Sequence, residues 1–155
     1  MKELLEYRVK LIERLREAAQ EFRRAGGAIN DPQQKVEGEW TLHQIAVHTR
    51  DVGRSVYGER ILRTIHETNP EFKNFEAEDW MREHYNIEEP LNKVLDEFTA
   101  DVEELCNTLK NQPLEAWSRV SRHETMGGDL TMQLWVERHL AHIEEHLQAL
   151  KKAGN

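Results

Sequence analysis

The stretch Trp40–Val52, WTLHQIAVHTRDV, contains both the start of a helix and the spacing of a partly buried helical face. Thr41 can accept a hydrogen bond in the first turn while Gln44, three residues on, reaches back to the backbone, which is the capping-box pattern. From Ile45 onward the apolar residues recur at helical spacing, so one face of this segment is expected to pack in a core. We predict a helix from Thr41 to about Thr68, ahead of an Asn-Pro pair.

The sequence on either side of this helix also shows amphipathic helical patterns. Three more amphipathic segments each carry one apolar stripe, and they predict helices over 3–25, 87–111, and from Asp129 or Thr131 to about Lys152. No stretch alternates apolar and polar residues for long enough to favour a strand. Four helices of similar length with one stripe each favour a four-helix bundle, so the fold class expected is all-α.

The connections and the length complete the expected architecture. The segments 69–86 and 112–129 exceed ordinary helix-hairpin loops, so a long crossover is expected, with one short helical turn around Trp80. A chain of 155 residues suits a single domain spanning 1–155. We therefore expect no sheet of three or more strands.

Composition excludes several classes of function. With 29 Asp and Glu against 21 Lys and Arg, the net charge of −8 is unsuited to neutralising a phosphate backbone, so no nucleic-acid partner is expected. No run of 18 apolar residues predicts a membrane span, and the charged N-terminal segment does not resemble a signal peptide. Cys106 is the single cysteine, which excludes an internal disulfide. We expect a cytoplasmic protein.

Histidines mark the candidate site. In the last helix His139, His142 and His146 share one side, at the edge of the apolar stripe, and His48 has a similar flank position on the helix that begins at Thr41. If these flanks face each other, His48 can converge with His142 and His146, since imidazoles at i and i+4 can bind one ion. Three neutral imidazoles with an open fourth position form a catalytic type of metal site.

The pattern alone leaves a structural role open for each of these histidines, because a single histidine at the edge of a core is more often a satisfied side chain than a ligand. The remaining histidines lie on predicted polar faces or in loops and are expected to be exposed: His43, His66, His84 and His123. The tryptophans are interpreted as core and helix-start residues rather than a base-stacking platform, because no basic groove accompanies them.

Two segments resemble the signature motifs of the DinB/YfiT-like metalloenzyme superfamily, the DinB family. They are WTLHQIAVHTRD, residues 40–51, and HIEEHLQAL, residues 142–150. That family has a Trp-Ser/Thr start, a histidine followed by a nearby acidic residue on the second helix, and a histidine-x3-histidine pair on the last long helix. The resemblance covers the whole chain in length and helix order, although fewer than ten motif residues carry it. It implies a four-helix bundle in which His48, His142 and His146 hold a divalent ion, commonly zinc or nickel.

The resemblance also implies a chemistry. Similar proteins include transferases that join a low-molecular-weight thiol to an electrophile, so a small-molecule substrate and a thiol or water activated at the metal are expected. Ligand imidazoles usually donate their other N–H to a carboxylate or carbonyl, and Asp51 and Glu145 are the candidate catalytic or supporting groups, with His139 as a neighbour of the site. Helix packing into a homodimer is a further expectation from the family.

Two classes of function remain open at the level of sequence. The first is a metal-dependent enzyme, either a thiol S-transferase or a hydrolase. The second is a helical bundle that binds a metal or small ligand without turnover. Metal analysis of protein without an affinity tag, followed by thiol-conjugation assays, distinguishes them.

Overall fold

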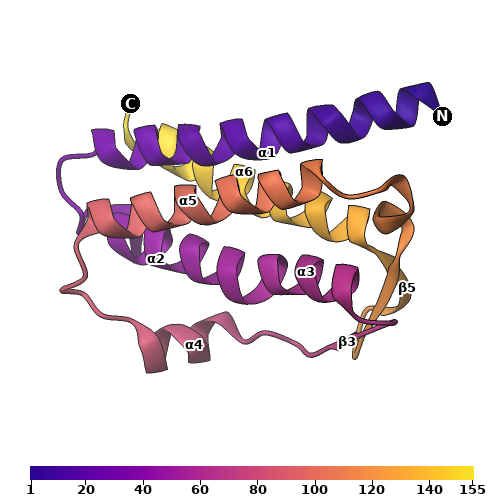
Figure 1. Cartoon of the computed structure of the whole chain (residues 1–155). Helices are drawn as coiled ribbons and strands as arrows, with labels where there is room; N and C mark the ends of the chain where they lie inside the picture. Colours follow the sequence, from indigo (N-terminus) through magenta and orange to yellow (C-terminus); the bar gives the residue numbers. More distant parts are fainter.

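The computed structural model describes residues 1–155, and four helical rods packed side by side dominate it (Figure 1). The first rod is α1, Lys2–Ala28, and the second is formed without a break by α2, Leu42–Val52, a π-helical segment η1, Gly53–Gly58, and α3, Glu59–His66. The third and fourth are α5, Leu91–Lys110, and α6, Met132–Ala153. The α1 rod packs on α5 and α6, and the α2–α3 rod packs on the same two helices from the other side. The predicted four-helix bundle is confirmed.

The connection between α3 and α5 returns along the length of the bundle, so that α5 runs in the same direction as α2 and α3 (Figure 1). This connection contains the short helix α4, Ala77–His84, where one helical turn was predicted around Trp80. The expected long crossover is therefore present. The second long connection begins with a 3-10 helix, η2, Leu114–Ser118.

No strands, and no sheet of three or more strands, were predicted. The structure contains both, so this expectation was wrong. A hairpin of β1, Lys35–Glu37, and β2, Trp40–Thr41, precedes α2, and a three-stranded sheet joins β3, Glu71–Phe72, to β4, Val120–His123, and β5, Gly127–Thr131. Strands of two to five residues are too short for an alternating pattern to appear in the sequence. The sheet ties the two long connections together at one end of the bundle and leaves the helical core unchanged.

The core lies between the four rods. Phe22 of α1 packs edge-to-face on Phe98 of α5, with ring centroids 5.2 Å apart, and burial of each such side chain contributes about 1.5–3 kcal/mol. Trp117 and Trp135 are buried as predicted, and the indole N–H of Trp135 donates to the Ser121 hydroxyl at 2.8 Å, which fastens β4 to α6. None of the helices is long and apolar enough to cross a membrane.

The predicted start of the second rod is confirmed in detail. The Thr41 hydroxyl accepts from the backbone N–H of Gln44 at 3.1 Å, and the Gln44 side chain accepts from the backbone N–H of Thr41 at 2.9 Å. Thr131 caps α6 by the same kind of bond to Leu134. The second rod ends at His66, two residues before the predicted end.

The π-helical segment η1 was not predicted, and two glycines explain it. A Cβ atom at Gly58 would lie 2.6 Å from the carbonyl oxygen of Gly53, so only glycine permits this wide turn without a shift of the backbone. A Cβ atom at Gly53 would lie 3.2 Å from the ring of His139, so α6 approaches η1 closely here. Such segments occur often at functional sites. This one forms part of the wall beside the histidine cluster.

Candidate metal centre

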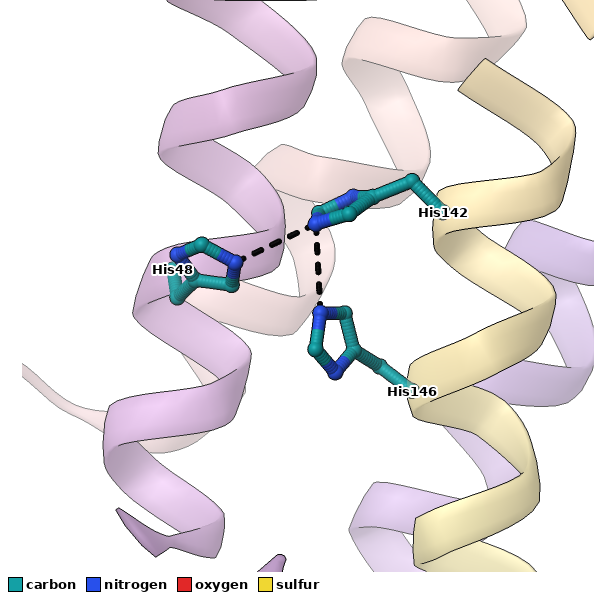
Figure 2. Close-up of side chains that lie close together, drawn as sticks. All are labelled: His48, His142 and His146. Atoms are coloured by element: carbon teal, nitrogen blue, oxygen red, sulfur yellow. Dashed lines mark hydrogen bonds between the residues drawn. The ribbon is translucent and has the colours of Figure 1, made fainter. Parts of the chain in front are cut away.

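Three histidine side chains converge between α2 and α6 (Figure 2). His48 projects from α2, and His142 and His146 project from successive turns of α6. The Nε2 atom of His142 lies 3.1 Å from the Nε2 atom of His48 and 3.1 Å from that of His146. One ring nitrogen from each residue lies within 4.8 Å of the other two. The structure thus brings together the three residues that the sequence predicted to meet.

The donor set fits a divalent ion. An ion at 2.0–2.1 Å from each nitrogen in tetrahedral geometry would separate the nitrogens by about 3.3–3.4 Å, which is close to the two spacings of 3.1 Å. Burial lowers the pKa of His48 to about 4, and burial together with the neighbouring imidazoles lowers the pKa of His142 to about 2. Both rings are therefore neutral at pH 7, as metal ligands must be.

Glu37 orients one of the three rings. Its carboxylate oxygen Oε1 lies 2.9 Å from Nδ1 of His146, so Nδ1 carries the proton and donates, and the Nε2 lone pair faces the cluster. Glu37 ends β1, and the turn to β2 includes Gly38 at a positive φ of 58°. Sequence reasoning missed Glu37, because a three-residue strand gave no signal that would direct it toward α6.

Replacement of Glu37 with alanine is expected to weaken metal binding by about 10- to 100-fold, because His146 would lose the acceptor that fixes its tautomer and orientation. Competition titration with a chromophoric zinc chelator measures the change. Glu39→Ala is the matched control, since Glu39 lies two residues away, is exposed and pairs only with Lys35. Equal affinities for wild type and Glu37→Ala would contradict this role.

The two carboxylates predicted to support the site lie apart from the three rings. Asp51 is 8% exposed and accepts hydrogen bonds from Nε of Arg50 at 2.9 Å and Nε1 of Trp80 at 3.1 Å. Its charge acts on His48 only through space. Glu145 is exposed on α6 and makes no hydrogen bond to the cluster. Glu37 provides the hydrogen bond expected of these residues, and catalytic roles for Asp51 and Glu145 stay predictions.

His139 lies beside the cluster, one turn before His142 on α6. Its ring is 1% exposed and stacks on Tyr57 with centroids 5.5 Å apart, and Tyr57 also packs against His142 at 5.6 Å. Its Nδ1 atom is buried and has no hydrogen-bond partner. Burial lowers the pKa of His139 to about 4, so this ring is neutral at pH 7.

This buried ring predicts a pH dependence of stability. An unfolded histidine titrates near 6.5, so between pH 6.5 and 4 the unfolded state binds more protons at His139 and the folded state loses stability as the pH falls. From pH 7.5 to 5 the loss is about 2 kcal/mol. Urea denaturation of the metal-free protein should show this loss reduced by about that amount in His139→Gln. An identical pH dependence in both proteins would contradict the prediction.

A pocket of about 320 Å³ opens beside His48 and His142. Its wall comes from α2, η1, α3, α6 and the long connections. The residues that line it combine apolar, aromatic and cationic side chains with two histidines of the cluster: His48, Val52, Val56, Tyr57, Arg60, Asn74, Phe75, Ala77, His123, Thr125, Met126 and His142. Two of the three clustered histidines, His48 and His142, thus line a pocket that a small molecule could occupy.

Two other histidines correct the expectation that all four would be exposed. His43 is buried, with Nε2 2.6 Å from the carbonyl oxygen of Glu89. His123 is buried as well, and its Nδ1 accepts from the backbone N–H groups of Thr125 and Met126. The hydrogen-bond partners of both rings lie in the long connections, and helical periodicity could not predict where those connections run. His66 and His84 are exposed as predicted.

Comparison with known proteins bears on the fold. No family model matches the sequence, and no curated protein matches it. A solved structure does match: YfiT from Bacillus subtilis, described as "a probable metal-dependent hydrolase with an unusual four-helix bundle topology". The TM-score is 0.71 at 20% sequence identity, over 90% of this chain and 85% of that one. This chain therefore has the YfiT-type four-helix-bundle fold that its two histidine motifs predicted.

Proposed function

We propose that this protein is a divalent-metal-dependent enzyme that acts on a small molecule. The observation that carries the proposal is the convergence of three ring nitrogens at the edge of a pocket: Nε2 of His142 lies 3.1 Å from Nε2 of His48 and of His146, and all three nitrogens lie within 4.8 Å of one another. Neutral imidazole ligands suit zinc or nickel. The metal-dependent activity attributed to YfiT agrees with this proposal.

Each residue of the cluster would have a specific role in holding the ion. His48, His142 and His146 would hold the ion, and Glu37 keeps the Nε2 lone pair of His146 directed at it. When bound, an ion with three neutral ligands would lower the pKa of water or a thiol at its open position enough to supply a nucleophile near pH 7. The aromatic ring of Tyr57 packs against His142, with the ring centroids 5.6 Å apart.

The pocket favours a thiol as one candidate nucleophile. No aspartate or glutamate lines it, so no carboxylate there can take a proton from an attacking group. His123 also lines it, but its Nδ1 accepts from two backbone N–H groups and its Nε2 lies 3.5 Å from Nη2 of Arg60. A free thiol has a pKa near 8.5 and needs less help than water to deprotonate. Transfer of a low-molecular-weight thiol to an electrophile is therefore the first candidate reaction.

Hydrolysis is the second candidate, supported by the description of YfiT. The three-histidine set with an open position is also the arrangement that activates water in zinc hydrolases and hydratases. In this case no carboxylate of the lining would assist, so the activation of water would depend on the ion that His48, His142 and His146 would hold.

Two measurements test the proposed function. Protein purified without an affinity tag is analysed for metal content, and the metal-loaded protein is then assayed with monochlorobimane plus several thiols, and separately with 4-nitrophenyl acetate. Thiol-dependent conjugation that disappears on chelation and returns with zinc or nickel supports transfer. Metal-dependent ester cleavage without thiol supports hydrolysis. Stoichiometric metal with neither activity would favour a non-catalytic metal-binding bundle.

A further inference from the structure

Arg60 of α3 is a partly buried cation without an acidic partner. Its guanidinium carbon lies 4.8 Å from the ring centroid of Trp135 and 5.8 Å from that of Phe72, and Nη2 donates to the carbonyl oxygen of Lys73 at 3.0 Å. No carboxylate lies within ion-pair distance of it. Nη2 also lies 3.5 Å from Nε2 of His123. The side chain is thus held in place by rings, one carbonyl and this long contact, while its Nε and Nη1 groups make no hydrogen bond to the protein.

Other arginines of this chain show the usual alternative. Arg63, one turn further along α3, makes two bonds to the carboxylate of Glu67, at 2.7 and 3.0 Å. Arg50 is buried and contacts three carboxylates. Arg8 follows the other pattern: it is 8% exposed, lies over the Trp117 ring at 5.5 Å and bonds Gln133 instead of a carboxylate. The lack of an acidic partner therefore does not by itself mark Arg60 as a binding residue, and its position has to be considered. Burial lowers the pKa of Arg60, but a guanidinium remains protonated at neutral pH.

The position of Arg60 gives this cation a role. It lines the same pocket as His48 and His142, and that pocket contains no aspartate or glutamate although these make up 29 of 155 residues. Outside the lining, Arg138 acts on Arg60 and Tyr57 through space with positive charge, while Glu59 acts on Arg60 and Glu145 on Tyr57 with negative charge. The lining itself thus carries one cation, Arg60, and no carboxylate, before any metal charge is counted.

We propose that Arg60 binds an oxyanion of the substrate, so that the small molecule acted on is an organic anion with a carboxylate or a phosphate-like group. This inference rests on the proposed function for its catalytic meaning, although the anion site itself needs no metal. Arginine forms paired hydrogen bonds to such groups. The apolar part of the lining, including Phe75, Met126 and Val56, fits a substrate with an apolar body.

A purely structural role for Arg60 is the alternative to be tested. In that case the guanidinium only covers Trp135, holds the Lys73 carbonyl and contacts Nε2 of His123. Arg63 provides the matched control, because its guanidinium also packs on Phe72, at 5.0 Å, while it does not line this pocket. Loss of packing should lower the stability of both Arg60→Gln and Arg63→Gln. Anion binding should weaken only in Arg60→Gln.

The probes are phenylacetate and benzylphosphonate, with the neutral isostere phenylacetamide. Binding of each is measured by calorimetry and by NMR of the Trp135 indole, with metal-free and zinc-loaded full-length protein. We expect the metal-free wild type to prefer an anion over phenylacetamide by about 10- to 100-fold, since a hydrogen bond to a charged group contributes about 1.5–3 kcal/mol. The preference should vanish in Arg60→Gln, persist in part in Arg60→Lys and remain in Arg63→Gln. The stronger of the two anions identifies the oxyanion class.

The outcomes separate this inference from the proposed function. An anion preference in metal-free protein that depends on Arg60 supports the inference even if no metal binds, in which case the proposed function fails alone. Metal binding at the three histidines without anion preference would overturn the inference and leave the proposed function standing. An unchanged preference in Arg60→Gln, or no binding of either anion at millimolar concentration, would also overturn it.

Discussion

Replacement of His142 with alanine is expected to abolish stoichiometric metal binding, with a loss of affinity well above the 10- to 100-fold typical of a residue that only supports a ligand. His142 is the ring that the other two approach, since both 3.1 Å spacings include its Nε2 atom. Without it His48 and His146 remain, and two imidazoles hold a divalent ion weakly. Elemental analysis after identical dialysis of both proteins measures the change.

The fold should survive this substitution. The apolar stripe of α6, which includes Ile143 and Leu147, is untouched, and Nδ1 of His142 is buried without a hydrogen-bond partner. The helical circular dichroism of the metal-free variant should therefore match that of the wild type. His66→Ala is the control, because His66 is exposed at the end of α3. Equal metal content in wild type and His142→Ala would rule out the three-histidine site.

Replacement of Arg50 with methionine is expected to lower the free energy of unfolding by about 3–5 kcal/mol, because it leaves partly buried carboxylates without their cation. Arg50 bonds Asp51 through Nε at 2.9 Å, and its Nη1 lies 2.6 Å from Glu89 and 3.2 Å from Glu97. The hydrogen bond from Arg50 holds the pKa of Glu89 at about 2. The network fastens α2, which carries His48, to α5 and the segment before it.

Arg54 provides the comparison for this prediction. It lies one turn further along the same rod and pairs with Asp101 at 2.9 Å, but its side chain is 46% exposed. An exposed pair contributes only about 0–1 kcal/mol, so Arg54→Met should change stability little. Urea denaturation at pH 7 in the presence of a chelator measures both variants. Similar small losses in the two would show that the Arg50 network does not fix α2.

The parts of this structure that the sequence could predict are those with a local or periodic signal. The capping box at Thr41 and Gln44 fixed the start of the second rod, and the flank positions of His48, His142 and His146 followed from helical geometry once two helices were assigned. The pairing of those flanks also needed a bundle in which α2 and α6 are neighbours, which the four apolar stripes predicted.

The parts that the sequence could not predict depend on contacts between distant segments. Glu37 reaches His146 from a three-residue strand, across 109 positions of the chain. The sheet pairs Glu71 with Arg122, where neither strand is long enough to show its own pattern. In the sequence, Arg60 looks like any surface arginine of an amphipathic helix. Only the structure shows that its guanidinium lies over Trp135, has no acidic partner and lines the pocket.

Anomalous diffraction from crystals of the zinc-loaded, tag-free protein is the measurement that tests the central claim most directly. The three-histidine site predicts one strong anomalous peak between α2 and α6, about 2.0–2.2 Å from Nε2 of His48, His142 and His146. It also predicts that Nδ1 of His146 still donates to Glu37. A peak located elsewhere, or none at the three rings in crystals grown with stoichiometric zinc, would contradict the account.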